Sequence, residues 1–187
     1  MKLSPDGKLL TLLKPRADEK SRFDLWARDT ATGEERMLVD SKKVGTGAEL
    51  SEAEKMQRER ARVGGTRGIV AYDWSADGKY VLYAAQDPKT AYDLWVLPLE
   101  GDRKPRLFLS TPFTEQQGQF SPDGRWIAYQ SNETGQFEIY VRPFPLPASG
   151  AGGKWPISNN GGMWPIWPAK GGEILYRSGD QVIAVGD

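Results

Sequence analysis

The sequence contains no cysteine and no histidine in its 187 residues. Without cysteine, the chain can form neither a disulfide bond nor a thiolate metal site. Without histidine, it can assemble neither a Ser-His-Asp triad nor a histidine-rich zinc or iron site. No G-x-S-x-G nucleophile elbow, P-loop or G-x-G-x-x-G motif occurs either. We therefore expect no catalysis, no bound metal and no cofactor from the residues of this chain.

Long apolar runs and an excess of charge of one sign are also missing. No run of 18 apolar residues occurs, and the N-terminus has no charged-then-apolar signal pattern, so no membrane span and no signal peptide are predicted. The 25 Lys and Arg balance the 25 Asp and Glu. Because a balanced chain has no strong basic field, nucleic acid is not an expected partner.

One tetrapeptide recurs along the chain. It stands at Ser4-Pro5-Asp6-Gly7, Ser75-Ala76-Asp77-Gly78 and Ser121-Pro122-Asp123-Gly124, and a degenerate copy stands at Pro168-Ala169-Lys170-Gly171. The last three copies are 46 and 47 residues apart. A fixed period near 45 residues with strand-like content predicts a propeller or a solenoid array.

The repeated tetrapeptide has the composition of a tight turn. Pro presets φ, Asp tolerates the bridge or left-handed region, and Gly supplies a positive φ. The residues assigned to this structural role are Asp6, Gly7, Asp77, Gly78, Asp123 and Gly124. Each Asp belongs to its own turn, and a calcium ion takes six to eight oxygen ligands, so these carboxylates predict no metal site.

Strand-like segments follow each turn at constant offsets. Alternating runs such as Lys79–Ala84 and Arg125–Gln130 come first. Segments made of an acid, an aliphatic and an aromatic residue follow at Asp24-Leu25-Trp26, Asp93-Leu94-Trp95 and Glu138-Ile139-Tyr140, and a further short run follows each of these. Four short antiparallel strands per repeat predict the blades of an all-β propeller.

The predicted organisation is one propeller of about four blades with one insertion. Blade 1 is expected at 1–40, the insertion at 42–67, blade 2 at 68–110, blade 3 at 111–157 and an incomplete blade 4 at 158–187. The innermost strand of blade 1 has room for only two or three residues, and blade 4 has no outer strand, so we expect a partial, open propeller from a larger protein. A closed four-bladed ring and a truncated or recombined reading frame are the alternatives. Open blade edges also predict self-association.

The insertion is predicted to hold one charged helix at about residues 50–62. Ser51-Glu52-Ala53-Glu54 is a capping box, good helix formers continue to Ala61, and Gly64-Gly65 ends the run. Within 42–67, seven Lys or Arg side chains stand against four Glu. This surplus indicates either a docking surface for an acidic partner or simply a solvated cover.

The repeats resemble known families. The turn and the acid-aliphatic-aromatic segment resemble the TolB-like and WD-like propeller repeat, and the stretch from Asp93 to Phe144 resembles propellers appended to bacterial serine/threonine kinases and transcriptional regulators. The first 85 residues resemble the N-terminal propeller of dipeptidyl peptidase IV-type enzymes of the prolyl oligopeptidase family. That resemblance implies a substrate-gating propeller whose catalytic α/β-hydrolase domain is not in this chain. The paired-glutamate segment of those enzymes has no match, and Glu34-Glu35 is not assigned its role.

The expected binding surface is the propeller face that carries the insertion. Loops between second and third strands, and connections between blades, share one face of a propeller. The residues proposed for a partner-binding face are Lys55, Arg58, Arg62, Asn132, Asn159 and Asn160. We therefore expect a non-catalytic scaffold with a protein or peptide partner. The alternatives are the gating propeller of a prolyl oligopeptidase-family peptidase and a periplasmic TolB-like partner protein.

Overall fold

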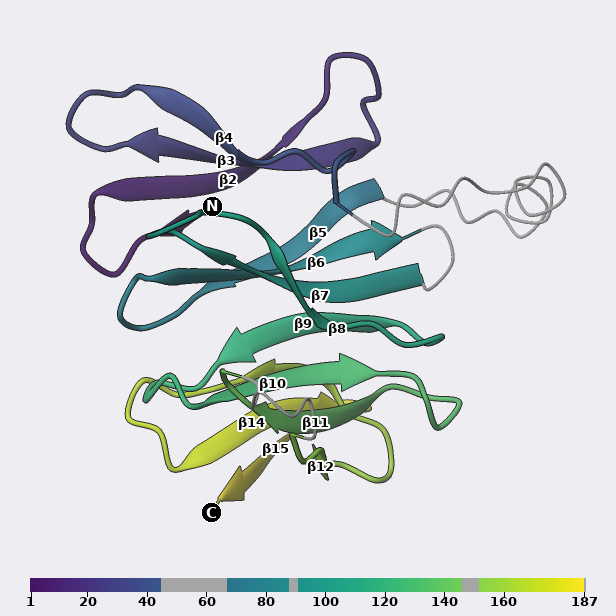
Figure 1. The fold of residues 1–187 in the computed structure, drawn as a ribbon. Helices are drawn as coiled ribbons and strands as arrows, with labels where there is room; N and C mark the ends of the chain where they lie inside the picture. Colours follow the sequence, from purple (N-terminus) through teal and green to yellow (C-terminus); the bar gives the residue numbers. More distant parts are fainter. Residues whose placement is uncertain (45–66, 88–90, 146–151, 187) are drawn as a thin grey trace, which may run out of the picture.

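The computed structural model describes residues 1–44, 67–87, 91–145 and 152–186, and within these ranges the chain is all β (Figure 1). The helix expected near 50–62 lies outside the described residues. The part of the chain that the structure describes contains no helix able to span a membrane. The observed all-β architecture confirms the predicted fold class.

In the described residues, fifteen strands form four antiparallel groups, which we call blades 1 to 4. Blade 1 contains β1 (Lys2–Leu3), β2 (Leu9–Pro15), β3 (Arg22–Asp29) and β4 (Glu35–Val39). Blade 2 contains β5 (Arg67–Trp74), β6 (Tyr80–Asp87), β7 (Ala91–Pro98) and β8 (Arg106–Leu109). Blade 3 contains β9 (Glu115–Phe120), β10 (Trp126–Ser131), β11 (Glu138–Pro143) and β12 (Trp155–Pro156). Blade 4 contains β13 (Met163–Ile166), β14 (Glu173–Ser178) and β15 (Gln181–Gly186).

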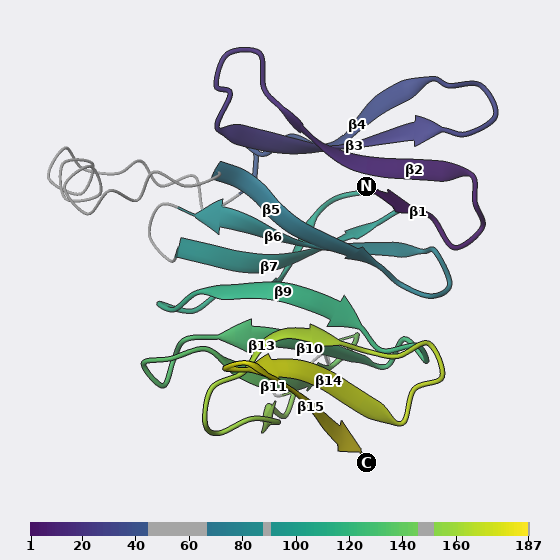
Figure 2. The same cartoon turned by 180° about the vertical axis from the view of Figure 1, so that it is seen from behind.

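The four blades are stacked in chain order as an open arc. In Figure 1 blades 1, 2 and 3 follow one another from top to bottom and blade 4 lies behind blade 3, and in Figure 2, seen from behind, blade 4 lies in front. A short parallel pairing of β3 with β5, at Arg22↔Arg67 and Phe23↔Gly68, joins blades 1 and 2 into one eight-stranded sheet. Among the described residues, β1 pairs only with β2 and β15 only with β14. The first and last blades therefore do not pair with each other.

Blade 2 shows why the stack is stable. Successive side chains of a strand point to opposite faces. Residues 81, 83 and 85 of β6 belong to the apolar cluster shared with Leu25 and Val39 of blade 1. Residues 82 and 84 belong instead to the cluster shared with Phe120 and Ile127 of blade 3. Both faces of the blade are therefore covered, and each large apolar side chain buried in this way contributes about 1.5–3 kcal/mol.

Polar contacts join the first strands of successive blades. Lys2 Nζ lies 2.7 Å from Asp73 Oδ1, and the Phe120 amide donates to Asp73 Oδ2 at 3.3 Å. One repeat later, the Trp167 amide donates to Gln119 Oε1 at 3.2 Å. Asp73 and Gln119 occupy the same position, directly before the aromatic residue that precedes the turn. In blades 2 and 3, the side chain at this position thus accepts a hydrogen bond from the main chain of the next blade.

The repeated turn is held by the same hydrogen bonds in each of its first three copies. In the second copy, Ser75 Oγ donates to Asp77 Oδ1 at 2.7 Å and accepts from the Tyr80 amide at 2.9 Å. The Lys79 amide also donates to Asp77 Oδ1 at 3.1 Å. Gly78 has a φ of 72°. The turns at Ser4 and Ser121 repeat this set.

The fourth copy of the turn keeps only its backbone. The Gly171 amide donates to the Pro168 carbonyl at 2.9 Å, as its counterparts do in the other copies. Gly171 has a φ of 69°, whereas Pro168 and Lys170 replace the Ser and Asp that cap the other turns. The glycine is therefore sufficient for this turn conformation, without the Ser and Asp side chains.

We expect Gly124→Val to lower Tm more than Arg125→Ala. Gly124 has a φ of 71°, and a Cβ there would meet no atom within 4 Å, so the cost is conformational. That cost is about 1–2 kcal/mol for a left-handed residue, which is roughly 2–4 °C per kcal/mol for a chain of this size. Arg125 makes only an exposed ion pair with Asp123, and such pairs are worth little.

Thermal unfolding followed by circular dichroism measures both variants. Gly124→Asn is the matched control, because Asn tolerates the left-handed region better than Val, and its Tm should lie between those of Gly124→Val and the unmodified chain. Equal losses for Gly124→Val and Arg125→Ala would contradict the role assigned to the glycine.

Candidate functional site

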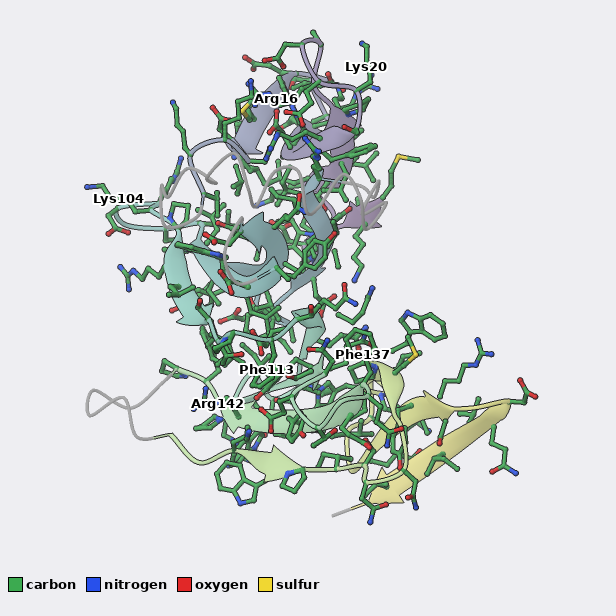
Figure 3. All side chains as sticks on the ribbon, turned by 90° about the vertical axis from the view of Figure 1, so that its right-hand side faces the viewer. Arg16, Lys20, Lys104, Phe113, Phe137 and Arg142 are labelled. Atoms are coloured by element: carbon green, nitrogen blue, oxygen red, sulfur yellow. The ribbon has the colours of Figure 1, made fainter. Side chains whose placement is uncertain are left out.

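One end of the arc carries loops of two kinds, and we call this end the loop face. It consists of the loops between second and third strands at 16–21, 132–137 and 179–180 and the connections leaving the blades at 40–44, 110–114 and 157–162. Figure 3 looks onto this end, with Arg16, Lys20, Phe113 and Phe137 labelled. The repeated turns lie at the other end, because β9 begins at the loop face with Glu115 and ends at the turn that starts with Ser121.

Hydrogen bonds hold the two kinds of loop together. The Thr114 amide donates to Asn132 Oδ1 at 2.9 Å. The Gly162 amide donates to the Phe137 carbonyl at 2.7 Å. Each of these bonds joins a loop within a blade to a connection between blades. The loops of this face therefore hold one another in place through hydrogen bonds.

A carboxylate at the start of the third strand fixes the chain where it leaves the blade. In blade 1, the amide and Oγ of Ser41 donate to Asp24 Oδ1 at 2.8 and 2.7 Å. In blade 3, Ser158 Oγ donates to Glu138 Oε2, and the Gly161 amide donates to Glu138 Oε1 at 2.8 Å. These acids are two of the recurring residues of the acid-aliphatic-aromatic segments. Their role in the described structure is to cap the connection to the next blade.

The charged side chains at the loop-face end of blade 1 form a network of ion pairs in which positive and negative charges offset one another. Arg16 Nη1 lies 2.8 Å from Asp24 Oδ2 and 2.7 Å from Asp40 Oδ1. Arg16 Nε lies 3.2 Å from Asp18 Oδ1, and Lys42 Nζ lies 2.5 Å from Asp18 Oδ2. The Lys42 ammonium and then the Arg16 guanidinium lower the pKa of Asp18 to about 2. Two cations and three carboxylates are thus engaged with one another and leave no positive excess in this network.

A buried carboxyl group lies under the middle of the loop face. Glu115 is 1% exposed, and its Oε1 accepts from Thr111 Oγ1 at 2.5 Å and from Ser131 Oγ at 3.3 Å. Its Oε2 is buried and has no hydrogen-bond partner among the described residues. Burial raises the pKa of Glu115, and the negative charge of buried Asp93 adds to the shift. The sequence pattern does not indicate Glu115, because one acid at a strand start carries no distinctive signal.

The predicted site residues have different surroundings. Asn159 and Asn160 are exposed on the connection between blades 3 and 4, and the Asn160 carbonyl accepts from Ser178 Oγ at 3.4 Å. Asn132 is half-buried and its Oδ1 is used within the scaffold. The residues Lys55, Arg58 and Arg62 lie outside the described residues. The turn residues Asp6, Gly7, Asp77, Gly78, Asp123 and Gly124 lie at the opposite end, where they hold the turns.

Exposed aromatic side chains are the feature of the loop face that the sequence pattern did not reveal. Phe113 is 41% exposed on the connection between blades 2 and 3, and Trp164, at the start of blade 4, is 43% exposed. Trp164 also has a φ of 54°, and the guanidinium of Arg177 lies 5.2 Å from its ring centroid. A period of 47 residues places Gln117, whose φ is 55°, at the equivalent position in blade 3.

The described residues contain no group of three or more acids that would hold a metal ion. The carboxylates of the loop face either accept hydrogen bonds from neighbouring loops, as Asp24 and Glu138 do, or are buried, as Glu115 is. What this arrangement offers chemically is a rigid platform of loops with exposed amide and aromatic groups.

Solved structures of propeller proteins share this fold. A protein described as TolB from Agrobacterium tumefaciens superposes with a TM-score of 0.66 at 18% identity, over 93% of this chain and 51% of that one. The β-propeller domain of Cps50 (Swd1) from Myceliophthora thermophila gives 0.58 at 13% identity, over 94% and 47%. A prolyl endopeptidase gives 0.60 at 13% identity, over 93% and 24%. No protein-family model matches the chain.

These likenesses establish the fold. The chain has the β-propeller architecture seen in TolB and WD-type propellers and in the propeller of prolyl endopeptidases, as the repeats predicted. It spans about half, or less, of the length of these structures. At identities below one in five, the shared fold does not carry the activity of any of these proteins to this chain.

We expect Glu115→Gln to change how stability depends on pH. The pKa of Glu115 is raised in the folded chain above its ordinary value of 4.5. The native state therefore holds a proton that the unfolded state has already released, so the unmodified chain loses stability as pH rises above about 4.5. Gln keeps the acceptor for Thr111 and Ser131 but does not titrate.

Urea unfolding at pH 4 and at pH 7 measures this effect. The free energy of unfolding of Glu115→Gln, relative to the unmodified chain, should increase between the two values. Glu100→Gln is the control, because Glu100 is exposed, and it should show no such trend. A Glu115→Gln difference that is the same at both pH values would contradict the raised pKa.

Proposed function

We propose that the chain is a non-catalytic binding scaffold within a larger propeller protein, and that it presents its loop face to a protein or peptide. The observation that supports this most directly is that polar side chains of that face form hydrogen bonds that fix its loops. Asp24, Glu138 and Asn132 each accept hydrogen bonds that fix a loop. A surface whose carboxylates and amides serve to hold loops in place is preorganised for binding.

The exposed groups of the loop face favour a protein or peptide partner. Phe113 offers an apolar contact on the connection between blades 2 and 3, and Asn159 and Asn160 offer amide donors and acceptors on the connection between blades 3 and 4. Lys20 is exposed at the blade 1 end (Figure 3). Aromatic anchors surrounded by adaptable polar groups are typical of protein-binding surfaces.

A second candidate is the substrate-gating propeller of a prolyl oligopeptidase-family enzyme. The observation in its favour is the likeness to a prolyl endopeptidase, of which this chain covers 24%. In that case the hydrolase chemistry would come from another domain. A periplasmic TolB-like partner protein is a third candidate, which the likeness to TolB supports. All three candidates share the expectation that this chain itself binds and does not catalyse.

The isolated chain should not hydrolyse prolyl dipeptide chromogenic substrates above background. With neither histidine nor cysteine in the sequence, neither a Ser-His-Asp triad nor a Cys-His pair can be assembled. The measurement is a release assay on protein purified by two independent routes. Turnover that follows the protein through both purifications would overturn the non-catalytic assignment.

Selection of peptides from a random display library tests the binding role. Peptides enriched on the immobilised chain should bind about tenfold or more weakly to Phe113→Ser or to Asn160→Ala, since central anchors carry most of the binding energy. Lys104→Ala is the matched control: Lys104 is exposed and lies away from Phe113 at the molecular edge in Figure 3. Enriched peptides that bind Phe113→Ser and Asn160→Ala as tightly as the unmodified chain would contradict the proposal.

A further inference from the structure

A single apolar side chain fills the cleft between blades 2 and 3. Phe144 follows β11, and its amide donates to the Arg125 carbonyl at 2.7 Å. Its ring centroid lies 5.1 Å from that of Tyr80 and 5.1 Å from that of Phe120, both edge-to-face, and 6.3 Å from that of Phe108. The residue after the third strand thus reaches back onto the preceding blade.

The cleft between blades 1 and 2 is filled in the same way. Leu99 follows β7, and its amide donates to the Lys79 carbonyl at 2.9 Å, as the Phe144 amide does to Arg125. Leu99 packs on the cluster that includes Trp74, together with Leu9 and Leu38 of blade 1. Leu99 and Phe144 therefore occupy one repeat position, and at both clefts that position carries an apolar plug.

Among the described residues, no side chain fills the cleft between blades 3 and 4. A cavity of about 700 Å³ lies there. Its apolar walls come from Trp126, Trp155 and Ile157 of blade 3 and from Trp167, Ile174 and Val185 of blade 4. We call this cavity the tryptophan groove. It lies at the turn end, bordered by the turns that contain Asp123 and Gly171, and Ile157 is the one residue of its lining that also belongs to the loop face.

The tryptophan groove has the walls of the filled clefts but not their plug. Trp126 stands at the repeat position of Tyr80, and Trp167 at that of Phe120, which are the two residues that hold the Phe144 ring. The pairing of Glu173 with Gly186 matches that of Trp126 with Pro143. The next residue in sequence is thus Asp187, which is outside the described residues and is not an apolar amino acid.

The shape of the groove favours a flat ring. The indoles of Trp126 and Trp155 meet at 84° with centroids 5.3 Å apart, which makes a notch between two perpendicular aromatic faces. Trp155 is 47% exposed although it lines an apolar wall. The charged side chains at the border are an exposed pair, Asp123 with Arg125, and exposed Lys170 and Glu173. Apolar walls with charges only at the border are typical of sites for apolar ligands.

We propose that the tryptophan groove binds an extended peptide segment of a partner protein that carries an aromatic residue next to proline. The aromatic ring takes the position that Phe144 holds one cleft earlier. The chain provides the template for this ligand, because both plugs directly follow a proline, as Pro98-Leu99 and Pro143-Phe144. Proline restricts φ and so lowers the entropic cost of ordering the segment, and proline-containing segments dock in aromatic-lined grooves. A volume of 700 Å³ accommodates the ring and its flanking residues.

The probe is the acetylated, amidated peptide Val-Arg-Pro-Phe-Pro, which copies residues 141–145. Nuclear magnetic resonance of the indole N–H groups follows its binding to the whole chain. The signals of Trp126 and Trp155 should move with the titration, and that of Trp26, in blade 1, should not. The peptide with Phe replaced by Asp should bind about tenfold or more weakly, because it lacks the buried ring.

Two variants of the chain separate the groove from a general loss of structure. Trp155→Ala removes one wall and should weaken binding of the Phe peptide about tenfold or more. Gly153→Ala keeps the indole but displaces it, since a Cβ on Gly153 would lie 2.5 Å from the Trp155 ring, and it should also weaken binding. Trp164→Ala is the control, because Trp164 is an exposed tryptophan that does not line the groove. Unchanged β-sheet circular dichroism verifies that each variant is folded.

Three results would overturn the proposal. Equal affinity of the Phe and Asp peptides would show that the groove does not select an aromatic ring. Shifts confined to β15 would show that the peptide pairs with a strand edge instead. Sedimentation of the chain as a dimer that Trp155→Ala converts to a monomer would show that a second copy, and not a partner peptide, occupies the groove. Phe113 does not line the groove, so Phe113→Ser should leave binding of the Phe peptide unchanged even if it abolishes binding at the loop face. The two proposals can therefore fail independently.

Discussion

Burial of apolar side chains between successive blades is the interaction on which the rest of this structure depends. Blade 2 is covered on both faces because its strands alternate side chains toward blade 1 and toward blade 3. Leu99 and Phe144 complete these contacts by reaching back across the cleft. The contact between blades 3 and 4 is smaller, with Ala128, Val141 and Ile174 as its buried residues. A repeat array draws its stability from such neighbour contacts, so blade 4 is held least firmly among the described blades.

Polar groups at the blade ends set the positions of the loops on this apolar framework. At one end the Ser and Asp of the first three turns accept hydrogen bonds from the amides that open the second strand. At the other end Asp24 and Glu138 hold the connections to the next blade. Buried polar groups must find partners, and these carboxylates find theirs in loops. The same requirement that stabilises the blades thus builds the rigid face that we propose as a binding surface.

The repeat pattern was sufficient to predict an all-β propeller, since the turn residues and the acid-aliphatic-aromatic segments report local geometry directly. The pattern was silent on Glu115, whose raised pKa comes from burial under two loops and from Asp93, which is distant in sequence. It was equally silent on the tryptophan groove. Trp126, Trp155 and Trp167 look like interblade core residues in the sequence, and only the packing of blade 4 shows that a cavity lies between them. The assigned blade boundaries and the charged helix near 50–62 remain predictions.

The sequence by itself determined the repeat, the turn and the strand order, because each depends on residues a few positions apart. A positive φ at Gly124 follows from its place in a tetrapeptide and needs no distant contact. Tertiary structure alone decided which side chains are buried, which carboxylates become caps and which cleft stays open. Those outcomes depend on neighbours 17 to 71 residues away in sequence, as for Ser41 with Asp24 and Lys2 with Asp73. Their energies depend on burial, which exists only once the blades have stacked.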